Sequence, residues 1–528
     1  MRDAREVAKV RAAEAKLMAA LPGGALMQRA AVGLAAVCGQ LLGHVYGSRV
    51  VVLAGGGDNG GDALYAAAQL ARRGTAVLAV AAGGRIHDGG AAALRAAGGR
   101  IATPDDAAVA PAIDRADLIL DGMLGIGGHG GLREPYATLA GLAARSAAIV
   151  VAVDLPSGVD ADTGVVDGAA VRADVTVTFG TWKPGLLVDP GASYAGVVEL
   201  IDIGLILDPP DVASAQAADI AALLPSPTAS SDKYRRGVLG LVSGSERFTG
   251  AAVLSAGGAI RGGAGMIRFV SAQPAVDVVR QWWPETVITP LPPEPAAPSG
   301  GGGNRWQDTT AEDFLTSVGR VQAWVAGPGM GTGDDSAELL AAVLRTDLPV
   351  LVDADGLTIL AEHRDLLPRQ APTLITPHAG ELSRLTGADR ADIEARRLTH
   401  AREAAGTLGV TVLLKGSTTV ICSPPGSPWS QPDRVNSTGT PWLATAGSGD
   451  VLSGLAGALL AQGLNPADAG AAAAFLHGVA ARRAAAGDQG PIGPGAADDV
   501  ATALEGAPIG AADVVRALPD AIRAVRSA

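Results

Sequence analysis

Two glycine–aspartate loops, Gly57-Asp58-Asn59-Gly60-Gly61-Asp62 and Ala446-Gly447-Ser448-Gly449-Asp450, decide the fold class of this chain. Each loop follows a segment that can end a strand, and each leads directly into an apolar pattern typical of a helix. Backbone N–H groups at the start of a helix bind anions, and glycine allows a phosphate group to come close. Because the two loops differ in sequence, they predict two different catalytic centres rather than one duplicated centre.

The length and composition of the chain indicate a globular protein of two domains. It has 528 residues, too many for one ordinary core, and 48% of them are hydrophobic against 18% charged. A net charge of −12 argues against a nucleic-acid partner, which requires clustered Lys and Arg. Cys38 and Cys422 have no metal-ligand spacing, and the most apolar early run is shorter than the roughly 20 residues of a membrane span. We therefore expect a cytoplasmic protein with no membrane and no nucleic-acid partner.

In the first half, short β-branched runs alternate with helical patterns, which is typical of an α/β fold with a parallel sheet covered on both faces. Strands are expected at 50–54, 77–81, 118–121, 149–154 and 175–179, and a helix at 62–73. Ligands bind such sheets at the carboxyl ends of the strands. The loops 55–62, 121–131 and 154–158 stand at these ends. Three polar, glycine-rich loops at one edge predict a binding site.

The second half repeats the strand pattern after a proline-rich boundary. Prolines at 209–210 and at 225 and 227 interrupt regular structure, so we expect domains at 1–210 and 231–528 joined by a linker at 211–230. The strands expected in the second domain are 238–243, 266–270, 323–326, 350–353, 374–376 and 410–414. The segment 290–304, rich in proline and glycine, is expected to be an exposed loop.

Oxygen-bearing side chains stand just beyond three strands of the first half. Asn59, Asp121 and Ser157 offer an amide, a carboxylate and a hydroxyl, a set that suits K⁺ better than a transition metal. Asp154 ends its strand and is the best placed general base. Alone, residues 57–62 are equally well explained as a tight turn with Asp62 favouring the helix start. The three loops together favour a functional site.

The second glycine–aspartate loop predicts phosphoryl transfer. Its glycines place N–H donors around a phosphoryl group, and Asp450 can accept a proton from a hydroxyl nucleophile. The segment Lys415–Thr419 follows an expected strand and offers a cation and hydroxyls to nucleotide phosphates. Taken singly, Lys415 is equally well an ordinary loop lysine, and His378 a residue that caps a turn. The chain has no Gly-x-x-x-x-Gly-Lys-Ser/Thr motif, so it is not a P-loop protein.

The first half resembles the NAD(P)HX epimerase family over about residues 15–205. The resemblance rests on Asp58–Asp62, Asp121–Gly125, Asp154–Asp160 and Thr178–Gly185. It implies a Rossmann-like, three-layer domain that interconverts the R and S hydrates of NADH and NADPH, called NADHX and NADPHX. The residues it implies for holding the hydrate are Asp58, Asn59, Gly60, Gly61, Asp62, Gly125, Ile126, Gly127, Gly128, His129, Gly130, Gly131 and Asp154.

The same resemblance implies that Asp154 contacts the hydrated nicotinamide and that K⁺ is bound by Asn59, Asp121 and Ser157. The family usually has Asn where Asp58 stands in this chain.

The second half resembles the ribokinase-like, ADP- or ATP-dependent NAD(P)HX dehydratase family over about residues 232–485. The matching segments are Thr249–Ala252, Gly263–Gly265, Ala326–Gly331, Asp353–Gly356, Thr376–Glu381, Lys415–Thr419 and Ala446–Asp450. The family phosphorylates the 6-hydroxyl of the S hydrate and then eliminates phosphate, which restores the dihydronicotinamide. The resemblance implies a C-terminal ribokinase-like α/β domain with Asp450 as the base on that hydroxyl.

The same resemblance implies residues for two binding functions. Ala252, Gly329 and His378 line the hydrate site, and the adenine nucleotide is held by Lys415, Gly416, Ser417, Thr418, Thr419 and Gly449. We predict ADP as the co-substrate, with Mg²⁺. Ser448 stands where the family usually has Thr, which keeps the hydroxyl.

Together, the two halves suggest a bifunctional enzyme that repairs hydrated nicotinamide cofactors. The dehydratase acts on one epimer, and the epimerase supplies it from the other. The resemblance implies a homo-oligomer with the small-molecule partners NADHX, NADPHX and ADP. Two alternatives stay open at this point. One is a ribokinase-type small-alcohol kinase fused to a non-catalytic dinucleotide-binding module, and the other is a first half that serves only as an interaction module.

Overall fold

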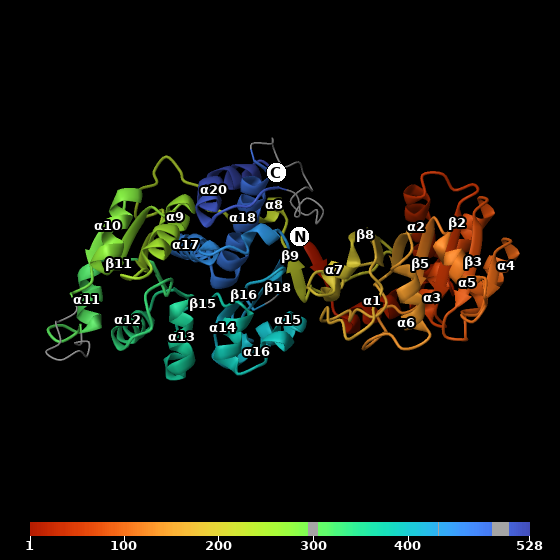
Figure 1. Ribbon diagram of the computed structural model, residues 1–528, viewed down its shortest axis with the longest axis horizontal. Helices are drawn as coiled ribbons and strands as arrows, with labels where there is room; N and C mark the ends of the chain where they lie inside the picture. Colours follow the sequence, from red (N-terminus) through yellow and green to blue (C-terminus); the bar gives the residue numbers. More distant parts are fainter. Residues whose placement is uncertain (294–304, 431, 488–505) are drawn as a thin grey trace. The chain divides into compact units, whose positions relative to one another are not determined.

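The computed structural model describes residues 1–293, 305–430, 432–487 and 506–528, and the chain divides between Val212 and Ala213 into two units (Figure 1). The segment 211–230, expected to be a linker, holds β9 (Val212–Ser214) and α8 (Ala217–Leu223). Ile220 of α8 is fully buried in the core of the second unit, so much of this segment is folded. Of the loop expected at 290–304, Pro290 ends a strand, and residues 294–304 lie outside the described residues.

The first unit is built on a seven-stranded parallel sheet. Its strands lie in the order β4 (Arg100–Ala102), β3 (Ala76–Ala81), β2 (Arg49–Ala54), β5 (Leu118–Gly122), β6 (Ile149–Val153), β7 (Val175–Phe179) and β8 (Val197–Ile201). From β2 the chain runs outward through β3 to β4 and then returns to β5, beside β2. Ligands bind α/β sheets where the strand order reverses in this way. The carboxyl ends of β2 and β5 are therefore the expected place for a site.

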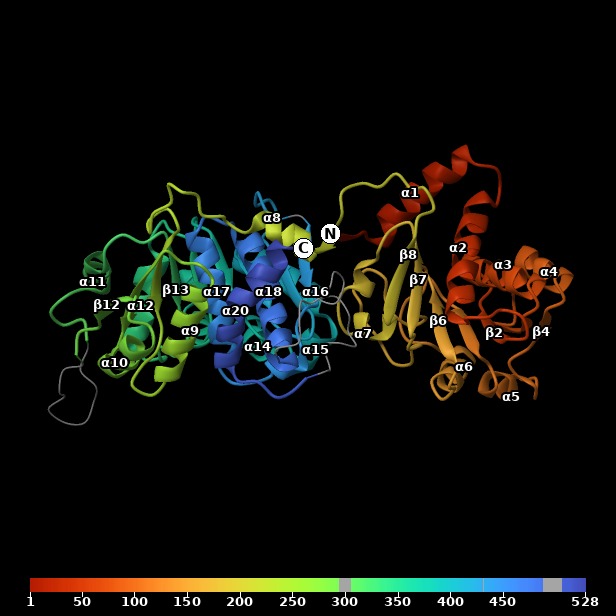
Figure 2. The same cartoon turned by 90° about the horizontal axis from the view of Figure 1, so that it is seen from above.

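Helices cover both faces of this sheet, because alternate residues of a strand point to opposite sides. Val50 and Val52 of β2 face a core shared with α2 (Ala25–Leu41), α3 (Asp58–Arg72) and α4 (Asp88–Ala96). Val51 and Leu53 face α5 (Val109–Asp114) and α6 (Tyr136–Ala143). The two helical layers are visible in Figure 2. The expected three-layer architecture is confirmed. The remaining elements of the unit are β1 (Arg2–Ala4), α1 (Val7–Ala20), the 3-10 helix Pro184–Leu186 and α7 (Ala192–Ala195).

The second unit also has a sheet whose strand order reverses, here between β10 and β13. The chain runs from β10 (Val238–Val242) through β11 (Met266–Ser271) to β12 (Val287–Pro290). It then returns to β13 (Ala323–Ala326) on the other side of β10 and continues through β14 (Val350–Val352), β15 (Thr373–Ile375) and β16 (Thr411–Leu414), all parallel. Antiparallel β17 (Thr419–Cys422) and β18 (Asp433–Asn436) follow.

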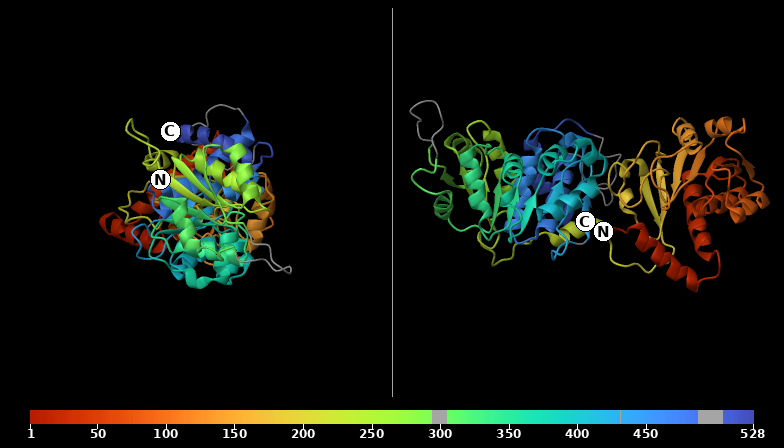
Figure 3. Two further views of the ribbon diagram at one scale, coloured as in Figure 1. Left: turned by 90° about the vertical axis from the view of Figure 1, so that its left-hand side faces the viewer. Right: turned by 90° about the horizontal axis from the view of Figure 1, so that it is seen from below.

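Two helical layers enclose this sheet as well (Figures 1 and 3). One layer consists of α9 (Thr249–Arg261), α10 (Gln273–Trp282), α17 (Ser448–Ala461), α18 (Pro466–Ala486) and α20 (Ala511–Arg526). The other contains α11 (Ala311–Val318), α12 (Asp334–Leu344), α13 (Asp355–Glu362), α14 (Ala379–Thr386), α15 (Arg390–Ala395) and α16 (Arg397–Leu408). The 3-10 helices are Arg364–Leu366 and Pro441–Leu443.

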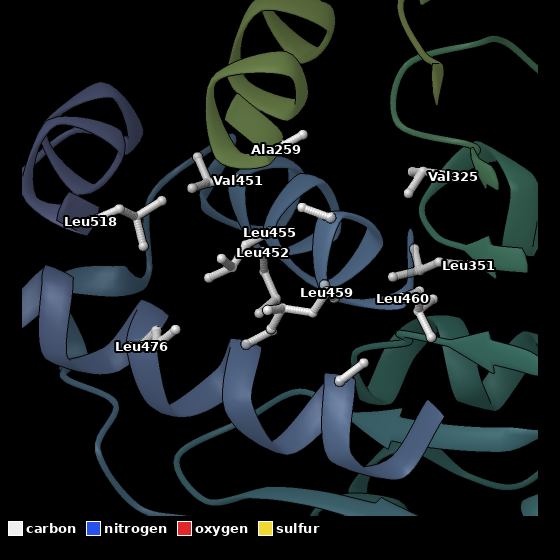
Figure 4. Close-up of a cluster of buried hydrophobic side chains, with 14 of the residues drawn as sticks. Ala259, Val325, Leu351, Val451, Leu452, Leu455, Leu459, Leu460, Leu476 and Leu518 are labelled. Carbon is white, nitrogen blue, oxygen red and sulfur yellow. The ribbon is translucent and has the colours of Figure 1, made fainter. Parts of the chain in front are cut away.

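Helix α17 is the central helix of its layer, and every residue from Val451 to Ala461 is buried. Figure 4 shows Leu455 and Leu459 surrounded by side chains of other elements, among them Leu476 of α18 and Leu518 of α20. A helix that is apolar on all sides is stable only when it is enclosed in this way. The enclosure holds the start of α17, which carries Asp450, in a fixed position.

The structure differs from the sequence prediction at short and antiparallel strands. The strands β4, β8, β12, β17 and β18 were not expected, because strands of three to five residues give little periodicity. Helix α3 begins at Asp58 rather than at Asp62, so the residues of the first glycine–aspartate loop form its first turn.

No single helix in the described part of the chain is long and apolar enough to cross a membrane. Helices α1 and α2 meet such a test only as a pair, bent by 113°. Leu34 and Cys38 of α2 are buried in the core of the first unit.

Candidate active sites

Asp154 directly follows β6 and has a φ of +64°, a conformation that few residues other than glycine adopt but that Asp tolerates better than most. Its Oδ1 atom accepts hydrogen bonds from Thr178 Oγ1 at 3.1 Å, from the Phe179 N–H at 3.3 Å and from the Lys183 ammonium. Lys183 is 1% exposed, among the most deeply buried large side chains of the protein. This turn and these donors hold the Asp154 carboxylate at the edge of the sheet where ligands are expected.

Asp121 and Ser157, two of the three residues predicted to bind K⁺, lie in direct contact. The Asp121 carboxylate accepts hydrogen bonds from Ser157 N at 2.8 Å, Ser157 Oγ at 2.7 Å and Met123 N at 3.3 Å. Burial raises the pKa of Asp121 to about 6, although the hydrogen bonds from Ser157 lower it. A buried carboxylate with a raised pKa is stabilised by a nearby cation.

The first turn of α3 brings the predicted phosphate-binding loop to the same edge. A Cβ on Gly60 would overlap the Gly55 carbonyl oxygen, so this close turn requires glycine. Within the described residues, Asn59 Nδ2 and Asp62 Oδ1 are buried and have no hydrogen-bond partner. Burial, and then the charges of Asp154, Asp58 and Glu14, raise the pKa of Asp62 well above its usual range. Buried polar atoms without a partner are rare, so these two are available to a ligand.

The loop 125–131 lies against this turn. A Cβ on Gly125 would contact the Asn59 side chain at 3.0 Å, which places the third predicted K⁺ ligand beside the loop. The Arg11 guanidinium of α1 lies against Gly127 and is a cation that the sequence reasoning missed. His129 is largely exposed, and its Nδ1 lies 3.4 Å from Asp160 Oδ2. The structure thus brings Asp58–Asp62, Asp121, Ser157, Asp154 and this loop to one edge.

In the second unit, Asp450 is the third residue of α17, among the free N–H groups at the helix start. Burial, and then the nearby carboxylates of Asp353, Asp355 and Glu381, raise the pKa of Asp450 to about 7 against the opposing charge of Lys415. A base whose pKa lies near neutral pH is well matched to proton transfer.

Lys415 connects the start of α17 to the end of β14. Its Nζ donates a hydrogen bond to Asp353 Oδ1 at 2.8 Å and lies 3.7 Å from Glu381 Oε2. Ser453 Oγ of α17 donates to the other Asp353 oxygen at 2.6 Å. Burial lowers the pKa of Lys415, but Asp353 and Glu381 outweigh it and raise the pKa overall. Lys415 therefore stays a cation, and its Nζ would lie 3.4 Å from a Cβ on Gly449.

Arg397 of α16 holds the predicted nucleotide loop Lys415–Thr419 through two backbone carbonyl groups. Arg397 Nη2 donates to the Lys415 carbonyl at 2.6 Å, and Nε donates to the Thr418 carbonyl at 3.2 Å. Thr418 is buried, whereas Gly416 and Ser417 are exposed at the tip. Arg397 lies inside a helical pattern, so nothing in the sequence pointed to it.

His378 caps α14, as one of the sequence interpretations proposed. Its Nδ1 accepts hydrogen bonds from Gly380 N at 3.0 Å and Glu381 N at 3.2 Å. Burial lowers the pKa of His378, Glu381 raises it and Lys415 lowers it. The Lys415 N–H donates to the Pro377 carbonyl at 2.8 Å, so His378 and the nucleotide loop are neighbours.

Ala252 and Gly329 were predicted to line the hydrate site. Ala252 lies in the first turn of α9, and Gly329, in the loop after β13, packs against the start of that helix. Gly329 has a φ of +62°, and a Cβ there would come within 2.8 Å of Ala251 Cβ. The Ala252 side chain is fully buried against Gly244. No part of Ala252 is therefore exposed to a ligand in this structure.

Some polar residues of the two sites had no role assigned from sequence. All three charged residues Lys183, Asp353 and Glu381 lie inside the motifs quoted above, and a charged residue within a motif was the available signal. Asp353 directly follows β14, Lys183 lies in the loop after β7, and Glu381 lies in the first turn of α14. For a role of Ser453 there was no signal in the sequence, because serine is common in helices.

Both halves of the chain match known families. A family model described as NAD(P)H-hydrate dehydratase matches residues 239–494, and one described as YjeF-related protein N-terminus matches residues 23–185. The bifunctional NAD(P)H-hydrate repair enzyme Nnr of Mycobacterium leprae is 47% identical over 498 residues, covering 93% of this chain and 96% of that protein. The enzyme of the same name from Salinibacter ruber is 35% identical, covering 88% of each chain.

Among solved structures, the ADP/ATP-dependent NAD(P)H-hydrate dehydratase from Bacillus subtilis is 25% identical, with a TM-score of 0.46, covering 59% of this chain and 97% of that one. The two family models follow each other along the chain, and the Mycobacterium relative matches over nearly its whole length. The chain belongs to the family of bifunctional NAD(P)H-hydrate repair enzymes.

Proposed function

We propose that the first unit epimerises R- and S-NAD(P)HX and that the second unit dehydrates the S form to NAD(P)H, converting ADP to AMP and phosphate. The observation that carries the proposal is that each unit places one aspartate, Asp154 or Asp450, among glycine-rich loops at its ligand-binding edge. The family membership favours this function over a small-alcohol kinase fused to a binding module.

In the epimerase unit, the first turn of α3 and the loop 125–131 would hold the diphosphate of the dinucleotide. Free N–H groups at a helix start favour an anion, and glycine permits its close approach. Asp154 would then face the hydrated nicotinamide as the base that moves a proton at the hydroxyl-bearing carbon. Asp58 adds a negative charge beside this anion site, where the family usually has Asn.

In the dehydratase unit, Asp450 would accept the proton of the 6-hydroxyl as its oxygen bonds to the β-phosphorus of ADP. The bond from that phosphorus to the bridging oxygen breaks, and AMP leaves. The N–H groups of the first turn of α17 and the Lys415 ammonium would stabilise the charge on the transferring group. Phosphate then leaves the nicotinamide ring, and loss of a proton from the adjacent carbon restores the double bond.

The proposed cations fit the two units differently. Asp121, Ser157 and Asn59 supply one buried carboxylate and two neutral groups, a donor set that suits K⁺. In the described part of the second unit, no group of three or more His, Cys, Asp or Glu side chains has the arrangement of a metal site. Mg²⁺ would therefore be held mainly by the nucleotide phosphates, as is usual for this ion.

We expect K⁺ to raise the unfolding temperature of the first unit by several degrees relative to the same concentration of tetramethylammonium, which is too large for the site. A ligand that binds only the folded state stabilises it by mass action. The measurement is differential scanning calorimetry, with Asp121→Asn as the variant that loses the effect. Equal unfolding temperatures in both salts would remove the K⁺ assignment.

The function is tested by the recovery of NADH absorbance from a mixed R- and S-NADHX preparation, with ADP or ATP and Mg²⁺. Wild type should run to completion. We expect Asp154→Asn to give a fast partial recovery from the S form, followed only by slow spontaneous epimerisation, because its epimerase is about 10²-fold slower.

Two results would contradict the proposal. If no NADH appears with either nucleotide and a stable phosphorylated product accumulates, the small-alcohol kinase becomes the better description. If Asp154→Asn completes the recovery as fast as wild type, the first unit has no epimerase site at Asp154.

Cytoplasmic location is supported by Cys38 and Cys422, which are both buried and free. The homo-oligomer stays a prediction that light scattering can test.

A further inference from the structure

Lys183 is a buried cation to which the mechanism above gives no role. It is 1% exposed and therefore does not reach a substrate. Besides its ion pair with Asp154, its Nζ donates hydrogen bonds to Thr178 Oγ1 at 2.9 Å and to the Phe179 carbonyl at 3.1 Å. A lysine ammonium has three N–H donors, so these partners use all of them. Lys183 is therefore fixed as a charged group that has no proton donor left for a ligand.

The hydrogen bonds to Asp154 are distributed unequally between its two oxygens. Lys183, Thr178 and the Phe179 N–H all donate to Oδ1. Among the described residues, none donates a hydrogen bond to Oδ2. A carboxylate held by three donors at one oxygen has a fixed plane and presents the other oxygen.

The surroundings of Asp154 are otherwise acidic. Three carboxylates lie near it: Asp58 and Asp62 of α3 and Glu14 of α1. Burial and then the charge of Asp154 raise the pKa values of Asp62 and Glu14. The cations on this side are Lys183 and Arg11 of α1, which both lower the pKa of Glu14. Of the two, only Lys183 bonds directly to Asp154.

From this geometry we propose that Lys183 is the positioning residue of the epimerase: it holds Asp154 through Oδ1 so that Oδ2 alone meets the hydrated nicotinamide. Thr178 also helps to hold Asp154, but without a charge. Its hydroxyl accepts a hydrogen bond from Lys183 and donates one to Asp154 Oδ1. The inference rests on the proposed role of Asp154.

The test is the pH profile of epimerase kcat/KM in Lys183→Met, which keeps most of the length of the side chain and removes its charge. Without the ammonium, the neighbouring carboxylates favour proton binding to Asp154. We expect the acid limb of the profile to move to higher pH by about 1–3 units, the usual effect of a close opposite charge. At neutral pH the rate should fall about 10-fold or more, chiefly in kcat, while KM changes little because Lys183 does not touch the substrate.

Two further variants separate charge from geometry. Thr178→Val removes one donor to Oδ1 but leaves the charge, so it should lower kcat with little movement of the acid limb. Lys183→Arg keeps the charge, so it should retain an acid limb closer to wild type than that of Lys183→Met. The cooperative unfolding transition of the first unit, followed by calorimetry in the same preparations, reports whether that unit is folded, because the dehydratase site lies in the other unit.

An acid limb unchanged in a folded Lys183→Met protein would overturn the inference. If Lys183→Met does not fold, an unchanged kcat in Thr178→Val would overturn the positioning of Oδ1 independently. Asp154→Asn distinguishes a failure of the epimerase site from a failure of the role of Lys183 alone. If Asp154→Asn remains fully active, the proposed epimerase site itself fails, whereas an inactive Asp154→Asn beside a wild-type-like Lys183→Met rejects only the role of Lys183.

Discussion

Asp450→Asn is expected to lower kcat of the dehydratase by about 10²–10⁴-fold, the usual contribution of a general base. The amide keeps the shape of the side chain but cannot accept the proton of the 6-hydroxyl. KM for ADP should change little, because the proposed nucleotide contacts come from Lys415–Thr419 and Gly449. The measurement is the initial rate of NADH formation from pure S-NADHX at saturating ADP.

The pH dependence provides a second readout of the same residue. Burial raises the pKa of Asp450 to about 7, and only the ionised form can act as a base. Wild-type kcat/KM should therefore rise with pH up to about 7 and then level off. The residual activity of Asp450→Asn should lack this limb.

A matched control is Asp520→Asn on the outer part of α20, where the carboxylate is half exposed. This variant should keep both activities. Interconversion of R- and S-NADHX, followed chromatographically without nucleotide, should be the same in wild type and in Asp450→Asn. A dehydratase rate in Asp450→Asn within a few-fold of wild type would show that another group takes the proton.

Gly454→Val is expected to destabilise the second unit by about 4 kcal/mol or more, in the range of the most damaging single substitutions. Gly454 lies on α17 where this helix packs against α9, and a Cβ there would overlap the Ser255 carbonyl oxygen. A backbone atom cannot rotate away as a side chain can, so the two helices must separate. That separation would open the core in Figure 4 and displace Asp450.

The measurement is thermal or urea unfolding together with both activities. We expect loss of dehydratase activity and retention of epimerase activity, because Gly454 belongs to the second unit only. Gly406→Val is the matched control, since Gly406 also lies within a helix but a Cβ there would be 3.8 Å from its nearest neighbour, Pro425. It should change stability by less than about 1 kcal/mol. Equal stabilities of the two variants would contradict the close contact of α9 with α17.

Much of the fold could be predicted from the sequence, because long apolar strands and helices repeat with characteristic periods. The strand at Val175–Phe179 and that at Ala323–Ala326 were predicted with the bounds that the structure has. Short edge strands such as β4 were missed, since three residues show no period. The folded state of α8 was also missed, because its Ile220 becomes a core residue only when the second unit is assembled.

The sequence by itself determined the α/β class, the glycine–aspartate loops and the order of the motifs, since these depend on residues that are close along the chain. Only the tertiary structure decided which charges meet. Lys183 lies 29 residues from Asp154, and Ser453 lies 100 residues from Asp353, yet each pair is in hydrogen-bond contact. The raised pKa of Asp450 likewise follows from burial and from carboxylates on other strands and helices. Such properties arise from desolvation and Coulomb interactions across space, which chain spacing does not record.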